Sequence, residues 1–160
     1  MTVSVTDHVM PEMSILSLRR VIPDYAGESQ LWADFGQLRA EAGDQLPVWL
    51  FGMKYGASYF DVDYRESDVD VAVWVEFRGE GPAPEGLEII HLPERRVARA
   101  TLRGSYEGMA EVLPAIGEWI GENGFVVDGP MFNVYLSSPR ENPDPSTWIT
   151  QINVPIAGRP

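Results

Sequence analysis

The sequence repeats one pattern of landmarks at an offset of 81 residues. Tyr25 and Tyr106 each precede a helical stretch, and the strand-like segment 70–75 corresponds to 151–156. Solenoid repeats have shorter periods, of roughly 20–50 residues. We therefore expect two copies of one supersecondary unit fused into a pseudo-symmetric domain, with a pocket at the seam between the copies.

The length and composition favour a single globular domain over residues 1–160, with halves of approximately 1–78 and 87–160. The chain is 44% hydrophobic and 22% charged, which is typical of globular proteins. It has no apolar run long enough to span a membrane and no signal-peptide pattern. It has no cysteine, which excludes disulfides and thiolate metal sites. We expect a cytoplasmic protein, of bacterial type, without a metal or other cofactor.

The formal net charge of −12 argues against direct binding of nucleic acid, because a polyanion requires a basic surface. The predicted helices also carry acidic residues on faces expected to be exposed, so neither helix suits a DNA groove. These residues are Glu28, Asp34 and Glu41 in the first helix and Glu111, Glu118 and Glu122 in the second.

Each half is predicted to have the order strand, helix, strand, strand. In the first half we expect strands at 14–21, 48–55 and 69–77, and a helix from about Glu28 to Ala42, with Gly43 ending the helix. The last two of these strands should pair antiparallel.

The second half is predicted to repeat this order, with strands at 95–102, 130–138 and 148–156. Ser105 suits the N-cap of its helix, which ends near Gly124. Pro114 conflicts with a regular helix. It predicts either a kink or a helix that effectively begins near Glu111.

Side-chain alternation in the last strand of each half separates an aliphatic side from a polar and aromatic side. The aliphatic side should lie under the helices, and the other side should line the cleft. The candidate ligand-binding residues are Tyr25, Lys54, Asp70, Trp74, Tyr106, Asn133, Tyr135, Gln151 and Asn153.

An ordered set of residues in the second half resembles the GyrI-like small-molecule-binding domain, also called the effector-binding domain of multidrug-responsive bacterial transcription activators. The set consists of 103–107, 119–120, 122–124, 129–130, Tyr135, Pro139 and 150–156. The resemblance implies an α+β, SOUL-like fold: a tandem β-α-β-β repeat with pseudo-twofold symmetry, antiparallel sheets, two helices and a central cleft.

Members of this family sense drugs, sequester small molecules, inhibit gyrase or hydrolyse cyclopropane-bearing compounds with a glutamate and a tyrosine. The position of the family's acid is Gln151 here, and an amide neither accepts a proton as a general base nor neutralises a cation. The matching position in the first half is Asp70, and Tyr135 matches the family's cleft tyrosine.

Several of these residues also have structural interpretations. Asp70 is expected to form a salt bridge with Lys54 if it is not a ligand contact. If it does not contact a ligand, Trp74 is expected to belong to the core. The alternative role for Tyr25 and Tyr106 is packing at the start of each helix. The histidines lack the context of haem ligands, and the acidic segment 61–70 lacks the spacing of a calcium loop.

The sequence therefore favours a stand-alone binding protein without catalysis, for an aromatic or hydrophobic and possibly cationic small molecule. One alternative is a hydrolase of reactive cyclopropane-bearing compounds that uses Tyr135 with Asp70. Another is a protein-interaction module, such as a gyrase inhibitor or the partner of a regulator.

Overall fold

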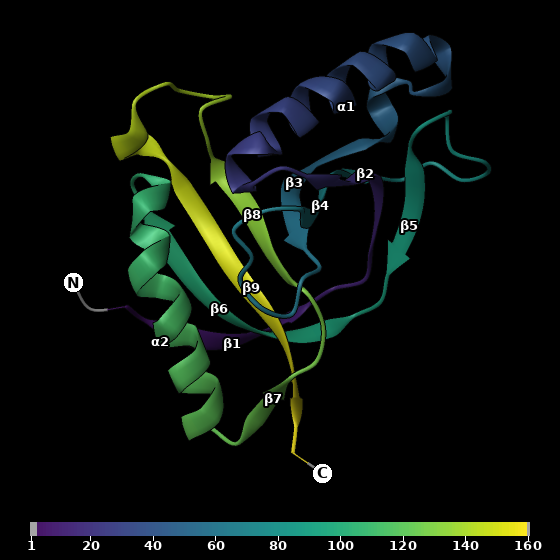
Figure 1. Ribbon diagram of the computed structural model, residues 1–160. Coiled ribbons are helices and arrows are strands. Elements are labelled where there is room, and N and C mark those ends of the chain that lie inside the picture. The colour runs from purple at the N-terminus through teal and green to yellow at the C-terminus, as the bar shows by residue number, and fades with distance from the viewer. Residues whose placement is uncertain (1–2, 160) are drawn as a thin grey trace. The chain divides into compact units, whose positions relative to one another are not determined.

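The computed structural model describes residues 3–159, which form two compact units. One unit consists of residues 12–93 and is called the middle unit here. The other combines the first eleven residues with residues 94–160 and is called the terminal unit. Each unit has one α-helix and antiparallel strands, which confirms the predicted α+β class (Figure 1).

The middle unit has the strand order β3-β4-β2-β5. Its elements are β2 (Met13–Ile22), α1 (Glu28–Ala42), β3 (Phe51–Tyr59), β4 (Val69–Phe77) and β5 (Glu88–Leu92). The predicted bounds of α1 and β4 are confirmed, and β3 and β4 pair antiparallel as expected. The short strand β5 was not predicted.

The terminal unit has the strand order β1-β6-β9-β8, and β7 pairs with the end of β9. Its elements are β1 (Val5–Met10), β6 (Arg95–Arg103), α2 (Met109–Glu122), β7 (Phe125–Val127), β8 (Met131–Ser137) and β9 (Ile149–Gly158). Sequence analysis missed β1 and β7. It also did not anticipate that the start of the chain pairs with β6.

Helix α2 begins at Met109 and continues through Pro114, so the expected start near Glu111 is wrong. Pro114 removes the hydrogen bond to the carbonyl of Ala110, which lies in the first turn, and the rest of the helix keeps its own bonds. Ser105 occupies the N-cap position of a 3-10 turn over Tyr106–Gly108, but its side chain makes no capping hydrogen bond.

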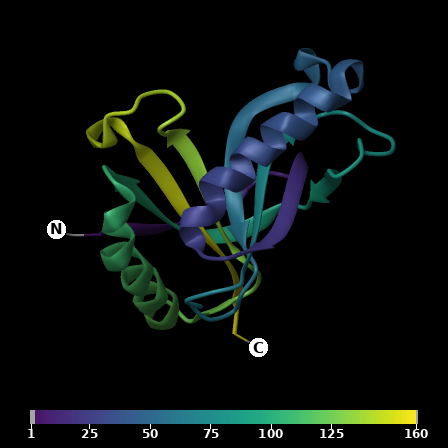
Figure 2. The same ribbon diagram turned by 45° about the horizontal axis from the view of Figure 1, so that its top comes forward.

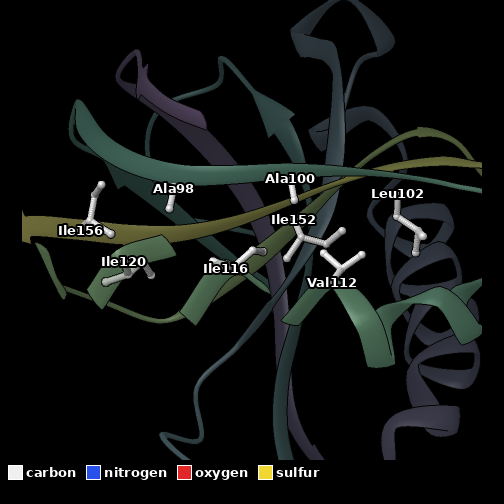
Figure 3. Close-up of a cluster of buried hydrophobic side chains, with 8 residues drawn as sticks. All are labelled: Ala98, Ala100, Leu102, Val112, Ile116, Ile120, Ile152 and Ile156. Atoms are coloured by element: carbon white, nitrogen blue, oxygen red, sulfur yellow. The ribbon is translucent and has the colours of Figure 1, made fainter. Parts of the chain in front are cut away.

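Each helix packs on one side of its own sheet. In the middle unit, α1 packs against β2 and β4 (Figure 2). The helix buries the side chains of Leu31 and Phe35. In the terminal unit, α2 and the strands β6 and β9 form one hydrophobic cluster (Figure 3). The cluster consists of Ala98, Ala100, Leu102, Val112, Ile116, Ile120, Ile152 and Ile156. Ile152 and Ile156 confirm that the aliphatic side of β9 lies under the helix.

Replacing Ile116 with Ala should lower the free energy of unfolding by about 2–5 kcal/mol, because a buried cavity would remain. Ile116 is 1% exposed, whereas Leu113 on the same helix is 40% exposed. Leu113→Ala is therefore the matched control and should cost about 1 kcal/mol or less. Urea unfolding of both variants measures the difference. Equal losses would contradict this position of the core.

Candidate functional site

The carboxylate of Asp70 forms a two-pronged ion pair with the guanidinium group of Arg19. Arg19 Nε donates to Oδ1 at 2.9 Å, and Nη2 donates to Oδ2 at 2.8 Å. In the pairing of β2 with β4, Arg19 lies opposite Ala72, so both project to the same side of the sheet. Asp70 is two residues from Ala72 and therefore projects to that side as well. The Arg19 guanidinium also lies over the ring of Phe60, 3.6 Å from its centroid.

The hydrogen bonds from Arg19 lower the pKa of Asp70, and they outweigh the opposing effect of burial. The expected pairing of Asp70 with Lys54 is wrong. Lys54 is exposed and lies near the start of β3, where its backbone N–H faces Glu76. Asp70 lies opposite the other end of β3, beside Tyr59 and Phe60. A bulge in β3 separates the two positions.

In the terminal unit, Gln151 and Asn153 project to the side of β9 opposite the helix, as predicted. Asn153 is fully buried, and its Oδ1 accepts a hydrogen bond of 2.7 Å from Arg99 Nε. The expectation that Asn133 and Tyr135 share this side is wrong. The register pairs Asn133 with Ile152 and Tyr135 with Thr150, and directly paired residues lie on the same side of a sheet.

The indole of Trp74 is fully buried, and its Nε1–H donates to Ser58 Oγ at 3.1 Å. Ser58 belongs to the neighbouring strand β3, on the same side of the sheet. The hydrogen bond satisfies the one polar atom of the indole and fixes the orientation of the ring.

An aromatic group in the terminal unit combines two of the predicted tyrosines with a tryptophan that sequence analysis did not propose. The rings of Tyr106 and Trp148 are stacked, with centroids 5.0 Å apart. Tyr135 meets Tyr106 edge to face at 6.1 Å. Tyr106 precedes α2 and Trp148 precedes β9, so two loops that follow different strands meet at this group.

The middle unit holds a carboxylate among aromatic side chains. Glu28, the first residue of α1, is half-buried and accepts a hydrogen bond of 2.5 Å from the hydroxyl of Tyr59. Its other oxygen accepts from Trp32 Nε1 at 3.3 Å. These two hydrogen bonds, from a phenol and an indole, orient the carboxylate. We call Glu28 with Trp32 and Tyr59 the Glu28 site.

Three further tyrosines extend the Glu28 site. Tyr25 lies 6.1 Å from Tyr59 and 5.7 Å from Tyr64, measured between ring centroids. Tyr55 meets Trp32 edge to face at 5.9 Å. These rings come from the turn before α1, from β3 and from the loop between β3 and β4.

Sequence analysis predicted that Glu28 would lie on an exposed helix face, which is wrong. The separation of four residues between Glu28 and Trp32 places both side chains on one face of the helix, and this was the available signal. The contact with Tyr59, 31 residues away, depends on how α1 packs over β3. No local pattern in the sequence indicates it.

Within residues 3–159, no three His, Asp or Glu side chains are placed to hold a metal ion. In the same part of the chain, no helix is long and apolar enough to cross a membrane.

A family comparison agrees with this geometry. The model of the GyrI-like small molecule binding domain matches residues 8–157. The chain belongs to the GyrI-like family. It is therefore a small-molecule-binding domain. No curated protein sequence matches the chain.

Solved structures show the same fold at low sequence identity. The EcmrR C-terminal domain is 20% identical, has a TM-score of 0.89, and aligns over 99% of this chain and 100% of that domain. The EcmrR chain in its complex with DNA is 19% identical and has a TM-score of 0.88. The match covers 98% of this chain but only 58% of the longer EcmrR chain.

Two structures with lower TM-scores are a hydrolase and a protein with a bound organic cation. A hydrolase from Listeria innocua is 14% identical with a TM-score of 0.62, and the match covers 96% of this chain and 91% of that one. The protein SAV2435, solved with tetraphenylphosphonium bound, is 15% identical with a TM-score of 0.55, and the match covers 99% and 95%.

Replacing Asp70 with Asn should lower the free energy of unfolding at pH 7 by about 1 kcal/mol or less. The pair is partly screened by water, since the side chains of Arg19 and Asp70 are 46% and 28% exposed. Folding lowers the pKa of Asp70, so its stabilisation is complete above the unfolded-state pKa of about 3.9. This stabilisation is lost as the pH falls from about 3.9 through the lower pKa that Asp70 has in the folded protein.

Urea unfolding of the wild type and of Asp70→Asn across this pH range measures the effect. The difference between the two proteins should disappear at the acidic end. A difference that stays constant from neutral to acidic pH would show that the Arg19–Asp70 pair is not its source.

Proposed function

We propose that this GyrI-like domain binds an aromatic, lipophilic cation at the Glu28 site and does not transform it. The observation that carries the proposal is the half-buried carboxylate of Glu28, which is oriented by Tyr59 and Trp32. A carboxylate of this kind attracts a cation more strongly than one in bulk water, because the effective dielectric constant around it is lower.

The aromatic rings beside Glu28 are suited to the same class of ligand. The faces of aromatic rings attract cations, and the attraction increases when the cation leaves water. Tyr64 is 78% exposed, so it offers its ring to a ligand that arrives from solvent.

The charge of the whole chain supports a cationic ligand. A net charge of −12 raises the local concentration of cations around the protein and repels anions. SAV2435 shares the fold and holds tetraphenylphosphonium, in which four phenyl rings surround a positively charged phosphorus. We use this compound as the probe ligand.

Two other candidate positions are poorly suited to supply the counter-charge for a cation. Gln151 carries a neutral amide. Asp70 carries a charge, but Arg19 already neutralises it through two hydrogen bonds. The counter-charge for a cation is thus proposed to lie at the start of α1 instead of in the last strand of either half.

The hydrolase alternative is favoured by the fold that the chain shares with a hydrolase from Listeria innocua. This alternative requires Asp70 as the base beside Tyr135. The lowered pKa of Asp70 makes this carboxylate a weaker base, and each of its oxygens already accepts a hydrogen bond from Arg19. We therefore keep binding without catalysis as the proposed function.

Glu28→Gln should weaken the binding of tetraphenylphosphonium by roughly tenfold to a hundredfold. The amide retains the shape of the side chain, but it removes the attraction between the carboxylate and the phosphonium. This attraction is worth about 2 kcal/mol for two charges roughly 8 Å apart at an effective dielectric constant of about 20. The matched control is Glu41→Gln, which removes the same charge from the other end of α1, where Gln37 donates to Glu41. Quenching of tryptophan fluorescence by the ligand gives both affinities.

The control variant should bind nearly as the wild type does. Equal affinities of Glu28→Gln and the wild type, in proteins with the same thermal stability, would refute the Glu28 site. An equal loss in both variants would show that the overall charge attracts the cation and that no specific carboxylate is involved.

A further inference from the structure

A groove of about 480 Å³ in the terminal unit is lined by the apolar residues Val3, Leu102 and Val112 and by polar side chains that can donate hydrogen bonds. Among the residues that line it are Thr6, His8, Arg99, Thr101, Arg103 and Gln151. The described residues that line this groove include no acidic side chain. This is unusual for a chain with twice as many acidic as basic residues.

Strand pairing explains why these donors share one side of the sheet. Strands β1 and β6 pair antiparallel with Thr6 opposite Arg99, and alternate residues of one strand project to the same side. Arg99, Thr101 and Arg103 thus form a row, in which the two arginines are about 13 Å apart along the strand. His8 joins the row from β1, and its Nε2 lies 2.9 Å from Thr6 Oγ1.

The guanidinium group of Arg99 carries a positive charge beside neutral partners. Its Nε donates to Asn153 Oδ1, and its Nη2 contacts Met10 Sδ at 2.7 Å. A guanidinium has five N–H donors, and these contacts use two of them. Arg99 is partly buried, and this burial lowers its pKa because it removes water from around the cation.

The middle unit contains the same arrangement with a carboxylate added. Arg19 faces Ala72 across β2 and β4, and Arg99 faces Asn153 across β6 and β9. Ala72 and Asn153 are equivalent positions in the 81-residue repeat. Asp70 fills the position next to Arg19, whereas Gln151 fills the equivalent position next to Arg99.

We propose that this groove is a second binding site, which takes the carboxylate or phosphate group of a small anionic molecule. The anion occupies the place that the Asp70 carboxylate holds in the middle unit, and it accepts hydrogen bonds from Arg99. Arg103 and Thr101 bind the remainder of an elongated anion. The site differs from the Glu28 site in charge and in unit, so each of the two proposals can fail alone.

The test is a nuclear magnetic resonance titration of the whole chain with inorganic phosphate and, separately, with glutarate. Ionic strength is held constant with potassium chloride. We expect saturable shifts of the amide signals of Thr6, Arg99 and Thr101. Arg99→Gln should weaken binding by roughly tenfold or more, because it removes a charge-assisted hydrogen bond. The affinities of the two probes decide between a phosphate and a carboxylate.

Two variants provide matched tests. Arg19→Gln removes the equivalent arginine, which is already paired, and should leave the affinity for the anion unchanged. Gln151→Glu should weaken binding about as much as Arg99→Gln, because it adds a carboxylate beside Arg99. It keeps the proposal testable if Arg99→Gln does not fold. Absence of saturable shifts with both probes, or unchanged binding by Gln151→Glu, would overturn the proposal.

Discussion

The packing of each helix against one side of its sheet determines where the polar groups of this GyrI-like domain lie. Val71 and Val73 in β4 and Ile152 in β9 are fully buried, and their strands must present the alternate residues to the opposite side. The Arg19–Asp70 pair lies on that opposite side. The same packing places the first turn of α1 against β3, which brings Glu28 to Tyr59 and creates the carboxylate site.

The two units show how one side chain changes the chemistry of a shared scaffold. An arginine occupies the equivalent strand position in both, as Arg19 and Arg99. Where the neighbour is Asp70, the charges are paired within the unit. Where the neighbour is Gln151, the arginine contacts neutral groups and is available to an external anion. The two units thus differ at equivalent positions: one holds an internal ion pair, and the other holds the proposed anion site.

The sequence predicted elements with strong local patterns and missed contacts that depend on the tertiary structure. The helical period and Gly43 gave correct bounds for α1, and uninterrupted aliphatic alternation gave those of β4. Strand β1 mixes charged and apolar residues, so its pattern resembles a loop. The side on which Tyr135 lies depends on the register of β8 with β9, and the burial of Glu28 depends on a partner 31 residues away. Neither is encoded locally.

The central claim is that an aromatic cation occupies the Glu28 site, and its location can be measured directly. Nuclear Overhauser effects from the phenyl protons of bound tetraphenylphosphonium identify the side chains that lie within about 5 Å, the contact range of stacked or edge-to-face aromatic rings. We expect cross-peaks to the rings of Trp32 and Tyr59. Cross-peaks to Tyr106 and Trp148 alone, with none to Trp32 or Tyr59, would contradict it.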